Sequence, residues 1–342
     1  MPANRQPPGP KHPWITFAAV YRNPLRSLAQ AVRDYGDIVH LRLGSRHHFL
    51  LNHPDYIRAI LLDQDGMRRS IHPPLKRFMG KGLLSSQGSF HQRQRRLVQP
   101  GFHKQRIAAL GDAMTLEGAR CSDRWRNGAT VDMAGEMMHL TMNIVGKTLF
   151  NVDFESDAAE LGKALDTVVV ASTRMNYAVS AAVRKFAPLL RSRRLERARS
   201  RLDQMVYQMI AERRAGDMDQ PDLLSMLLRI RDSEDAPKGM TDEQVRDEIL
   251  TLFTAGHETT AVALMWTWYL LSENPGAEEK LHAELDTVLN GRPPCTADLE
   301  HLPFTRMVFS EVMRLYASLL TLCRDVPVLL GSRLDQATLG HP

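Results

Sequence analysis

Residues 242–272 read DEQVRDEILTLFTAGHETTAVALMWTWYLLS and decide the fold. Thr241 and Gln244 form the pattern of a capping box, which begins a helix just after Thr241. Asn274 caps the end of this helix, and Pro275 opens the next one. About thirty residues at a rise of about 1.5 Å give a helix of roughly 45 Å, long enough to cross a whole domain. Because the stretch is apolar on most sides, we expect it to run through the interior.

Secondary-structure signals in the rest of the chain are mostly helical. Near the N-terminus, apolar and polar residues alternate over 39–43, and Gly44-Ser45 supplies a turn before 49–51, a pattern that predicts a β-hairpin. Pro54 suits the first turn of a short helix after this hairpin. Apolar spacing then predicts helices at 107–127, 133–150, 157–182, 188–215, 275–290 and 303–316. The sequence therefore predicts one mainly α domain with a small N-terminal β-sheet, threaded by the helix at 242–272.

The composition excludes several classes of protein. Among 342 residues, 44 are Lys or Arg, 39 are Asp or Glu and only 3 are Cys. Three cysteines cannot build a disulfide scaffold, so we expect a reducing compartment, the cytoplasm. The longest nearly apolar run, 261–271, is too short for a transmembrane segment, and the first residues show no signal-peptide pattern. The net charge of +5 does not indicate nucleic acid, and the arginine-rich run 191–201 favours a solvated helix face over nucleic-acid or membrane contact.

The middle of the long helix breaks the ordinary rules of helix composition. Gly256 costs about 1 kcal/mol relative to alanine in a helix interior. Glu258 places a charge in an apolar segment, and Thr259 and Thr260 can bond to backbone carbonyls and bend the helix. Such local violations in a buried element indicate a functional site. A water-filled kink whose polar residues face a cavity explains the same pattern.

The pair His257-Glu258 begins like the zinc-binding helix of metalloproteases. The second histidine of that motif would stand four residues after the first, where this chain has Ala261. With one ligand missing, the sequence argues against zinc-dependent hydrolysis.

Two further segments carry charged pairs at helical spacing. Glu311 and Arg314 lie three residues apart, so they can pair on one helix face, as many exposed ion pairs do. His91 and Arg95 lie four residues apart and could together hold a carboxylate or a pair of propionates. Taken alone, the segment 91–97 favours a solvated basic helix over a binding site.

Together and in this order, the segments resemble the cytochrome P450 family of haem–thiolate monooxygenases. The stretch 82–85 (GLLS) leads into the helix of His91 and Arg95, and 133–154 is similar to the family's fifth helical region. Ala255-Gly256-x-Glu258-Thr259 resembles the oxygen-activating helix, and Glu311-x-x-Arg314 the later helix that carries the family's ion pair. The resemblance covers roughly residues 5 to 316.

The resemblance implies haem b as cofactor and a role for each matching residue. His91, where many members have tryptophan, and Arg95 would hold the haem propionates, and the small Ala255 and Gly256 would let the helix lie close to the porphyrin. The catalytic residues would be Thr259, which would hydrogen-bond the dioxygen, and Glu258, which would relay protons. The ion pair of Glu311 and Arg314 would be structural.

The resemblance also implies partners. A small apolar organic substrate would be hydroxylated with O₂ and electrons from a ferredoxin- or flavodoxin-type donor, which would dock near Arg93, Arg95 and Arg96. Candidate substrate contacts are Met175, Tyr177 and Phe186, although helical core residues have the same pattern.

The axial ligand of the family is a cysteine thiolate in a glycine-containing loop beyond the Glu-x-x-Arg helix. None of Cys121, Cys295 and Cys323 stands in such a loop. We therefore expect residues 1–316 to be an incomplete cytochrome P450 domain, truncated before the cysteine loop and followed by a divergent tail, 317–342. On this reading the chain has no metal ligand and no activity by itself. The alternative function is that of a non-catalytic truncated remnant without stable haem binding.

Overall fold

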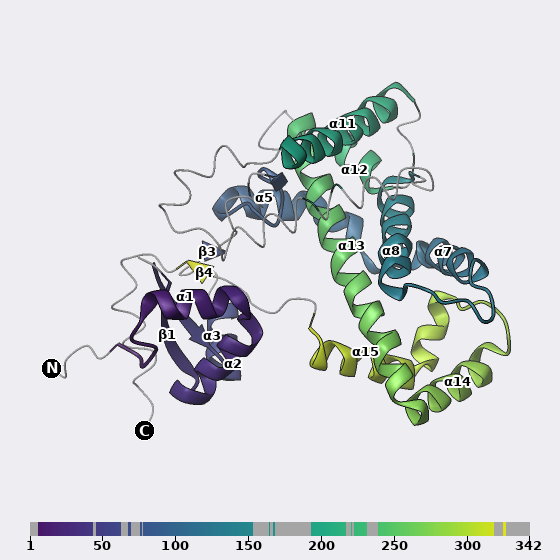
Figure 1. Cartoon of the computed structure of the whole chain (residues 1–342). Helices are drawn as coiled ribbons and strands as arrows, with labels where there is room; N and C mark the ends of the chain where they lie inside the picture. The colour runs from purple at the N-terminus through teal and green to yellow at the C-terminus, as the bar shows by residue number, and fades with distance from the viewer. Residues whose placement is uncertain are drawn as a thin grey trace. The chain divides into compact units, whose positions relative to one another are not determined.

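The computed structural model describes residues 6–43, 46–62, 68–69, 76, 78–152, 164, 167, 193–216, 220, 222–230, 239–317 and 324–325 (Figure 1). The chain divides into two compact units. The first comprises residues 1–75, 169–193 and 323–342, and the second comprises 76–168 and 194–322.

The first unit contains the predicted hairpin. Strands β1 (Ile38–Leu43) and β2 (Arg46–Leu51) pair antiparallel, from Ile38 opposite Leu51 to Leu43 opposite Arg46. Helices α1 (Pro13–Arg22) and α2 (Pro24–Tyr35) precede the hairpin, and α3 (Pro54–Leu62) follows it, beginning at the predicted proline. A second antiparallel pair joins β3 (Arg68–Arg69) to β4 (Arg324–Asp325).

The alternation of the first strand gives this unit its small core. Val39 and Leu41 point inward and are buried with Ala31 of α2. His40 lies between them in the sequence and therefore points to the other face of the pair. There its ring stacks on Phe49, which stands opposite it in β2.

The second unit is helical. In chain order it contains α5 (Gly88–Val98), η1 (Gln99–Phe102), α6 (Lys104–Ala109), α7 (Gly111–Asp123), α8 (Met133–Phe150), α11 (Arg193–Ala215), α12 (Leu223–Arg229), α13 (Asp242–Glu273), α14 (Pro275–Leu289), η3 (Thr296–His301) and α15 (Pro303–Leu315). α13 is the long predicted helix and runs through this unit, with α8, α12, α14 and α15 packed against it (Figure 1).

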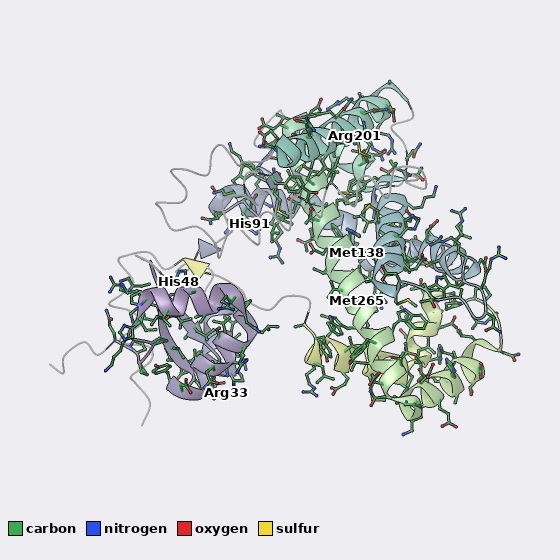
Figure 2. The ribbon with its side chains drawn as sticks, in the orientation of Figure 1. Arg33, His48, His91, Met138, Arg201 and Met265 are labelled. Atoms are coloured by element: carbon green, nitrogen blue, oxygen red, sulfur yellow. The ribbon has the colours of Figure 1, made fainter. Side chains whose placement is uncertain are left out.

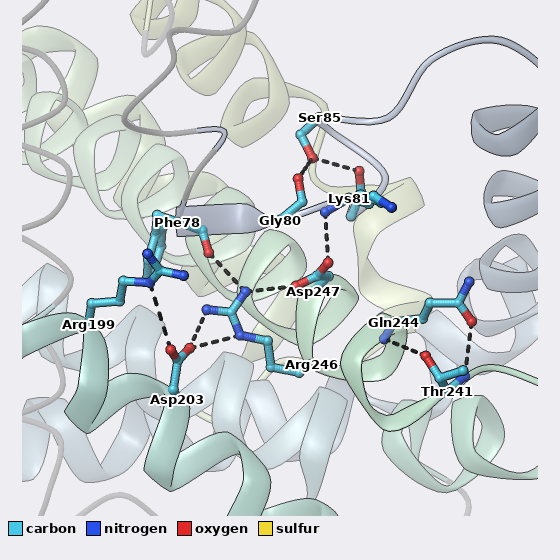
Figure 3. Close-up of polar contacts among 11 residues, drawn as sticks. Phe78, Gly80, Lys81, Ser85, Arg199, Asp203, Thr241, Gln244, Arg246 and Asp247 are labelled. Carbon is cyan, nitrogen blue, oxygen red and sulfur yellow. Dashed lines mark hydrogen bonds and ion pairs between the residues drawn. The ribbon is translucent and has the colours of Figure 1, made fainter. Parts of the chain in front are cut away.

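Local signals fix both ends of α13. The Thr241 hydroxyl accepts the Gln244 amide N–H at 3.2 Å, and the Gln244 side chain accepts the Thr241 N–H at 2.9 Å, which confirms the capping box (Figure 3). At the other end, Asn274 Nδ2 donates to the Leu270 carbonyl at 2.8 Å and its side chain makes no cap hydrogen bond to α14. Asn274 therefore closes α13, and Pro275 opens α14 as predicted.

Aromatic and small residues pack α13 against α8. The rings of Phe150 and Phe253 stack with centroids 6.0 Å apart. Further along, Ala261 is buried with Cys121 and Met137. Close approach of two helices over this length requires small residues at the contact.

Other predicted boundaries shift by a few residues. The segment expected as one helix at 107–127 is two, α6 and α7, which meet at Leu110. Of the helix expected at 157–182, the structure describes only residues 164 and 167, both helical. Among the helices that the structure does describe, none combines the length and the apolar character needed to cross a bilayer.

Candidate active site

The centre of α13 has one exposed face and one buried face. Ala255 and Thr259, one helical turn apart, are both exposed, and the Thr259 hydroxyl donates to the Ala255 carbonyl at 2.6 Å. Hydrogen bonds of this kind hold the threonine rotamer against the helix. The exposed face therefore presents a small methyl group beside a hydroxyl of fixed position.

Gly256 lies on the side that meets α8. A Cβ atom at this position would lie 3.2 Å from Val145 Cγ2, tighter than an ordinary van der Waals contact. The glycine therefore lets α8 and α13 approach closely, and this packing role accounts for its helix penalty. Its predicted role toward a porphyrin stays a prediction.

The two polar residues between Gly256 and Thr259 have different surroundings. His257 is buried, and its Nδ1 lies 3.0 Å from the Thr141 hydroxyl of α8. Burial lowers the pKa of His257 to about 4, so the imidazole is neutral at pH 7. Glu258 is half-buried at the edge of the exposed face.

The site does not have the layout of a zinc helix. Ala261, at the position of the second zinc-binding histidine, is 1% exposed and belongs to the core with Cys121. In the part of the chain that the structure describes, no three His, Cys, Asp or Glu side chains converge as metal ligands.

His91 and Arg95, which are predicted to bind the cofactor carboxylates, lie on α5. His91, which is labelled in Figure 2, is half-buried, and its Nδ1 lies 3.2 Å from the Ser86 hydroxyl. Arg95 and Arg96, in the last turn of the helix, are exposed. The helix thus offers a partly sheltered imidazole one turn from an accessible guanidinium.

Glu311 and Arg314 pair on one face of α15. Arg314 donates to both oxygens of Glu311, from Nε at 2.7 Å and from Nη2 at 2.6 Å. The guanidinium lowers the pKa of Glu311. Both side chains are more than half exposed, so the pair contributes little to stability among the described residues. Its bracing role stays a prediction.

Two cysteines, Cys121 and Cys295, lie in the part of the chain that the structure describes. Cys121 is buried and donates to Glu136, and burial followed by this hydrogen bond raises the pKa of its thiol to about 11. Cys295 is exposed at the start of η3. Cys323 and the candidate substrate contacts Met175, Tyr177 and Phe186 lie outside the described residues.

Three buried charges in α13 were missed by the sequence analysis. Arg246, Asp247 and Glu248 are 5%, 4% and 0% exposed. They directly follow the acidic first turn of α13, so in the sequence they look like a continuation of the solvent-exposed N-terminal turn. The signal that could have found them is the apolar run that begins directly after them at Ile249, since ionisable side chains at the start of a buried stretch must be partnered.

The residues present fit the distal side of a haem. All eight predicted site residues belong to the second unit. Ala255 is small and exposed where a flat ring would need room, and His91 and Arg95 are donors suited to carboxylates.

Comparisons with known proteins identify the family. The family described as Cytochrome P450 matches residues 7–328, which extends past Tyr316. The chain belongs to the cytochrome P450 family.

Several relatives carry names that state an activity. The chain is 39% identical over 302 residues to cyclooctatin synthase of Streptomyces melanosporofaciens, covering 86% of this chain and 64% of that protein. It is 34% identical to cyclooctat-9-en-7-ol 5-monooxygenase of the same organism, over 92% of this chain and 71% of the relative. It is 31% identical to pentalenene oxygenase of Streptomyces avermitilis, over 96% of this chain and 72% of the relative. The chain thus spans about two thirds of the length of these relatives.

Proposed function

We propose that the chain is the distal and central part of a haem-dependent monooxygenase that hydroxylates a terpene-type apolar substrate. The observation that carries this proposal is the exposed Ala255–Thr259 face at the centre of α13, in a chain that belongs to the cytochrome P450 family. The names of the three relatives support the terpene-type substrate.

Each predicted residue has a physical task in this proposal. His91 and Arg95 bind the cofactor carboxylates through charge-assisted hydrogen bonds, and Ala255 leaves room for the ring. When bound, haem supplies the redox-active iron for O₂-dependent hydroxylation. Thr259 holds a hydroxyl proton at the exposed face, and the half-buried carboxylate of Glu258 exchanges protons with solvent beside it.

The electron donor is proposed to be of the ferredoxin or flavodoxin type. The arginines of α5, two of them exposed in its last turn, form a basic surface that would attract an acidic protein. The low cysteine content supports a cytoplasmic location for this encounter.

A second candidate function is that of a non-catalytic form without stable haem binding. It is favoured by the cysteines, since Cys121 is a protonated core thiol and Cys295 precedes the Glu-x-x-Arg helix, whereas the family's axial cysteine follows it. On this proposal the 342-residue chain binds haem weakly or not at all and does not hydroxylate by itself.

Titration of the purified chain with hemin, followed by Soret absorbance, tests the proposal. Arg95→Ala should weaken hemin binding about tenfold or more, because a hydrogen bond between charged groups contributes about 1.5–3 kcal/mol. Arg306→Ala, an exposed arginine of α15, is the matched control and should bind as the wild type does. Absence of hemin uptake by the wild type, or equal weakening by both variants, would refute the proposed cofactor site.

A further inference from the structure

The buried ionisable side chains of Arg246, Asp247 and Glu248 need partners, because an isolated charge in a protein interior is strongly unfavourable. Only part of the compensation comes from other charged side chains. Arg246 donates to Asp203 of α11 and, at 2.7 Å, to Asp247 (Figure 3). Glu248 makes no such pair among the described residues.

The three side chains bind the backbone of one segment, residues 78–83. Arg246 Nη1 donates to the Phe78 carbonyl at 3.0 Å. Asp247 Oδ2 accepts the Lys81 amide N–H at 2.7 Å (Figure 3). Glu248 Oε2 accepts the Leu83 amide N–H at 2.9 Å. Successive residues of α13 thus fix successive parts of a segment about 165 positions earlier in the chain.

The segment is shaped to lie directly on the helix. Gly80 has φ +60°, and a Cβ atom there would overlap the carboxylate of Asp247. A Cβ atom on Gly82 would overlap the Thr251 hydroxyl and approach the Asp247 carbonyl. Both positions therefore require glycine for the backbone to reach the carboxylates.

The same segment leads to His91. The Ser86 amide N–H donates to the Gly82 carbonyl at 2.9 Å, which closes the turn after the clamped residues. The Ser86 hydroxyl then lies 3.2 Å from His91 Nδ1 on α5. The Ser86 hydroxyl also lies 3.4 Å from the Leu83 carbonyl, so a continuous set of polar contacts runs from Glu248 through Leu83 and Ser86 to His91.

We propose that Asp247 and Glu248 are positioning residues that hold the segment 78–86 on α13 and thereby fix where His91 presents its imidazole to the cofactor carboxylates. The inference rests on the proposed function in one respect, the binding of those carboxylates by His91. The clamp itself is a property of the chain without cofactor.

Two variants of Glu248 separate positioning from general packing. Glu248→Gln keeps an oxygen that accepts the Leu83 N–H, whereas Glu248→Leu removes it at similar volume. We expect Glu248→Leu to speed amide exchange over residues 81–86 about tenfold or more, measured by mass spectrometry, and Glu248→Gln to restore near-native exchange. Glu243→Gln, an exposed carboxylate of the same helix, is the control.

The link to His91 is read by its reactivity toward diethyl pyrocarbonate. We expect modification of His91 to be faster in Glu248→Leu and in Ser86→Ala, while His139 of α8 reacts at the native rate. Ser86→Ala leaves the carboxylate contacts intact and keeps the test valid if Glu248→Leu does not fold. Both variants should also weaken hemin binding, and Glu248→Gln should not.

The outcomes are distinguishable. Native exchange over residues 81–86 in Glu248→Leu, or unchanged His91 reactivity in Ser86→Ala, would overturn the clamp. If the wild-type chain takes up no hemin, the proposed cofactor site fails, and exchange and His91 reactivity still decide whether the clamp exists.

Discussion

Replacement of Glu248 by glutamine should remove the pH dependence that this residue gives to stability. Burial raises the pKa of Glu248 to about 7 from an ordinary value near 4.5, because desolvation outweighs the hydrogen bond from the Leu83 amide. The folded protein therefore retains a proton that the unfolded chain loses between these values. The contribution of Glu248 to the free energy of unfolding is therefore fully present below about pH 4.5 and falls as the pH rises to about 7. Above about pH 7 this contribution no longer changes with pH.

The magnitude follows from linkage. Each pH unit over which the two states differ by one proton changes the free energy of unfolding by about 1.4 kcal/mol. Between pH 5 and pH 8 the ionisation of Glu248 should therefore destabilise the wild type by about 2–3 kcal/mol. Glu248→Gln is neutral throughout this range. Its free energy of unfolding relative to the wild type should therefore rise by about 2–3 kcal/mol from pH 5 to pH 8.

Comparing the variant with the wild type at several pH values separates the effect of ionisation from the cost of an unsatisfied polar group. Glu248 Oε1 has no hydrogen-bond partner among the described residues, so the amide group of glutamine would be left equally unsatisfied there. That cost, about 1–3 kcal/mol, is the same at pH 5 and pH 8 and cancels in the difference.

His257 supplies an internal control with the opposite sign. Its folded pKa is about 4 against an ordinary 6.5, so its stability is present above about pH 6.5 and is lost as the pH falls toward 4. In the wild type the two dependences nearly cancel between pH 5 and pH 7. Glu248→Gln should therefore gain stability with rising pH relative to the wild type, and His257→Asn should lose it.

Urea unfolding followed by far-UV circular dichroism at pH 5, 6, 7 and 8 measures both variants against the wild type. A stability difference between Glu248→Gln and the wild type that stays constant from pH 5 to pH 8 would refute the reasoning. It would mean that Glu248 is ionised across the range and that its burial is compensated.

Three further predictions concern other parts of the second unit. Gly82→Ala should destabilise the protein by about 1–3 kcal/mol, because the added Cβ overlaps the Thr251 hydroxyl, and an unchanged urea midpoint would contradict this. Asp222→Ala should lower the free energy of unfolding by about 3–5 kcal/mol, because it removes both the buried partner of Arg213 and the α12 cap at the Ser225 amide. Asp222→Asn keeps the cap and should cost less in thermal or urea unfolding. Equal losses in the two variants would argue against the cap. The reduced 342-residue chain treated with carbon monoxide should show no thiolate-type Soret band, and a clear band would overturn the view that none of its cysteines is an axial ligand.

The ends of α13 could be predicted from the sequence because their causes are local. The capping box joins Thr241 to Gln244, three residues away, and Pro275 acts on its own backbone. The hairpin followed in the same way from alternation over a few residues. In both cases all the residues that determine the local structure lie within the segment that adopts it.

The clamp could not be predicted because its partners are far apart in the chain. Asp247 and Glu248 bind amides about 165 residues earlier, and nothing near them indicates which segment they meet. The role of His257 was missed for the same reason, since its partner Thr141 lies on α8. The glycines at 80 and 82 become informative only once the helix that covers them is known.

The periodicity of α13 connects the clamp with the candidate active site. Glu248, Ala255 and Thr259 are separated by seven and eleven residues, and at 3.6 residues per turn these spacings place them on one face of the helix. The segment 78–83 lies against this face at Glu248, whereas Ala255 and Thr259 are exposed. The two ends of the stripe are about 16 Å apart along a continuous helix. Because Glu248 and the Ala255–Thr259 pair share one face of a continuous helix, the segment that Glu248 holds meets α13 on the same side as the exposed pair.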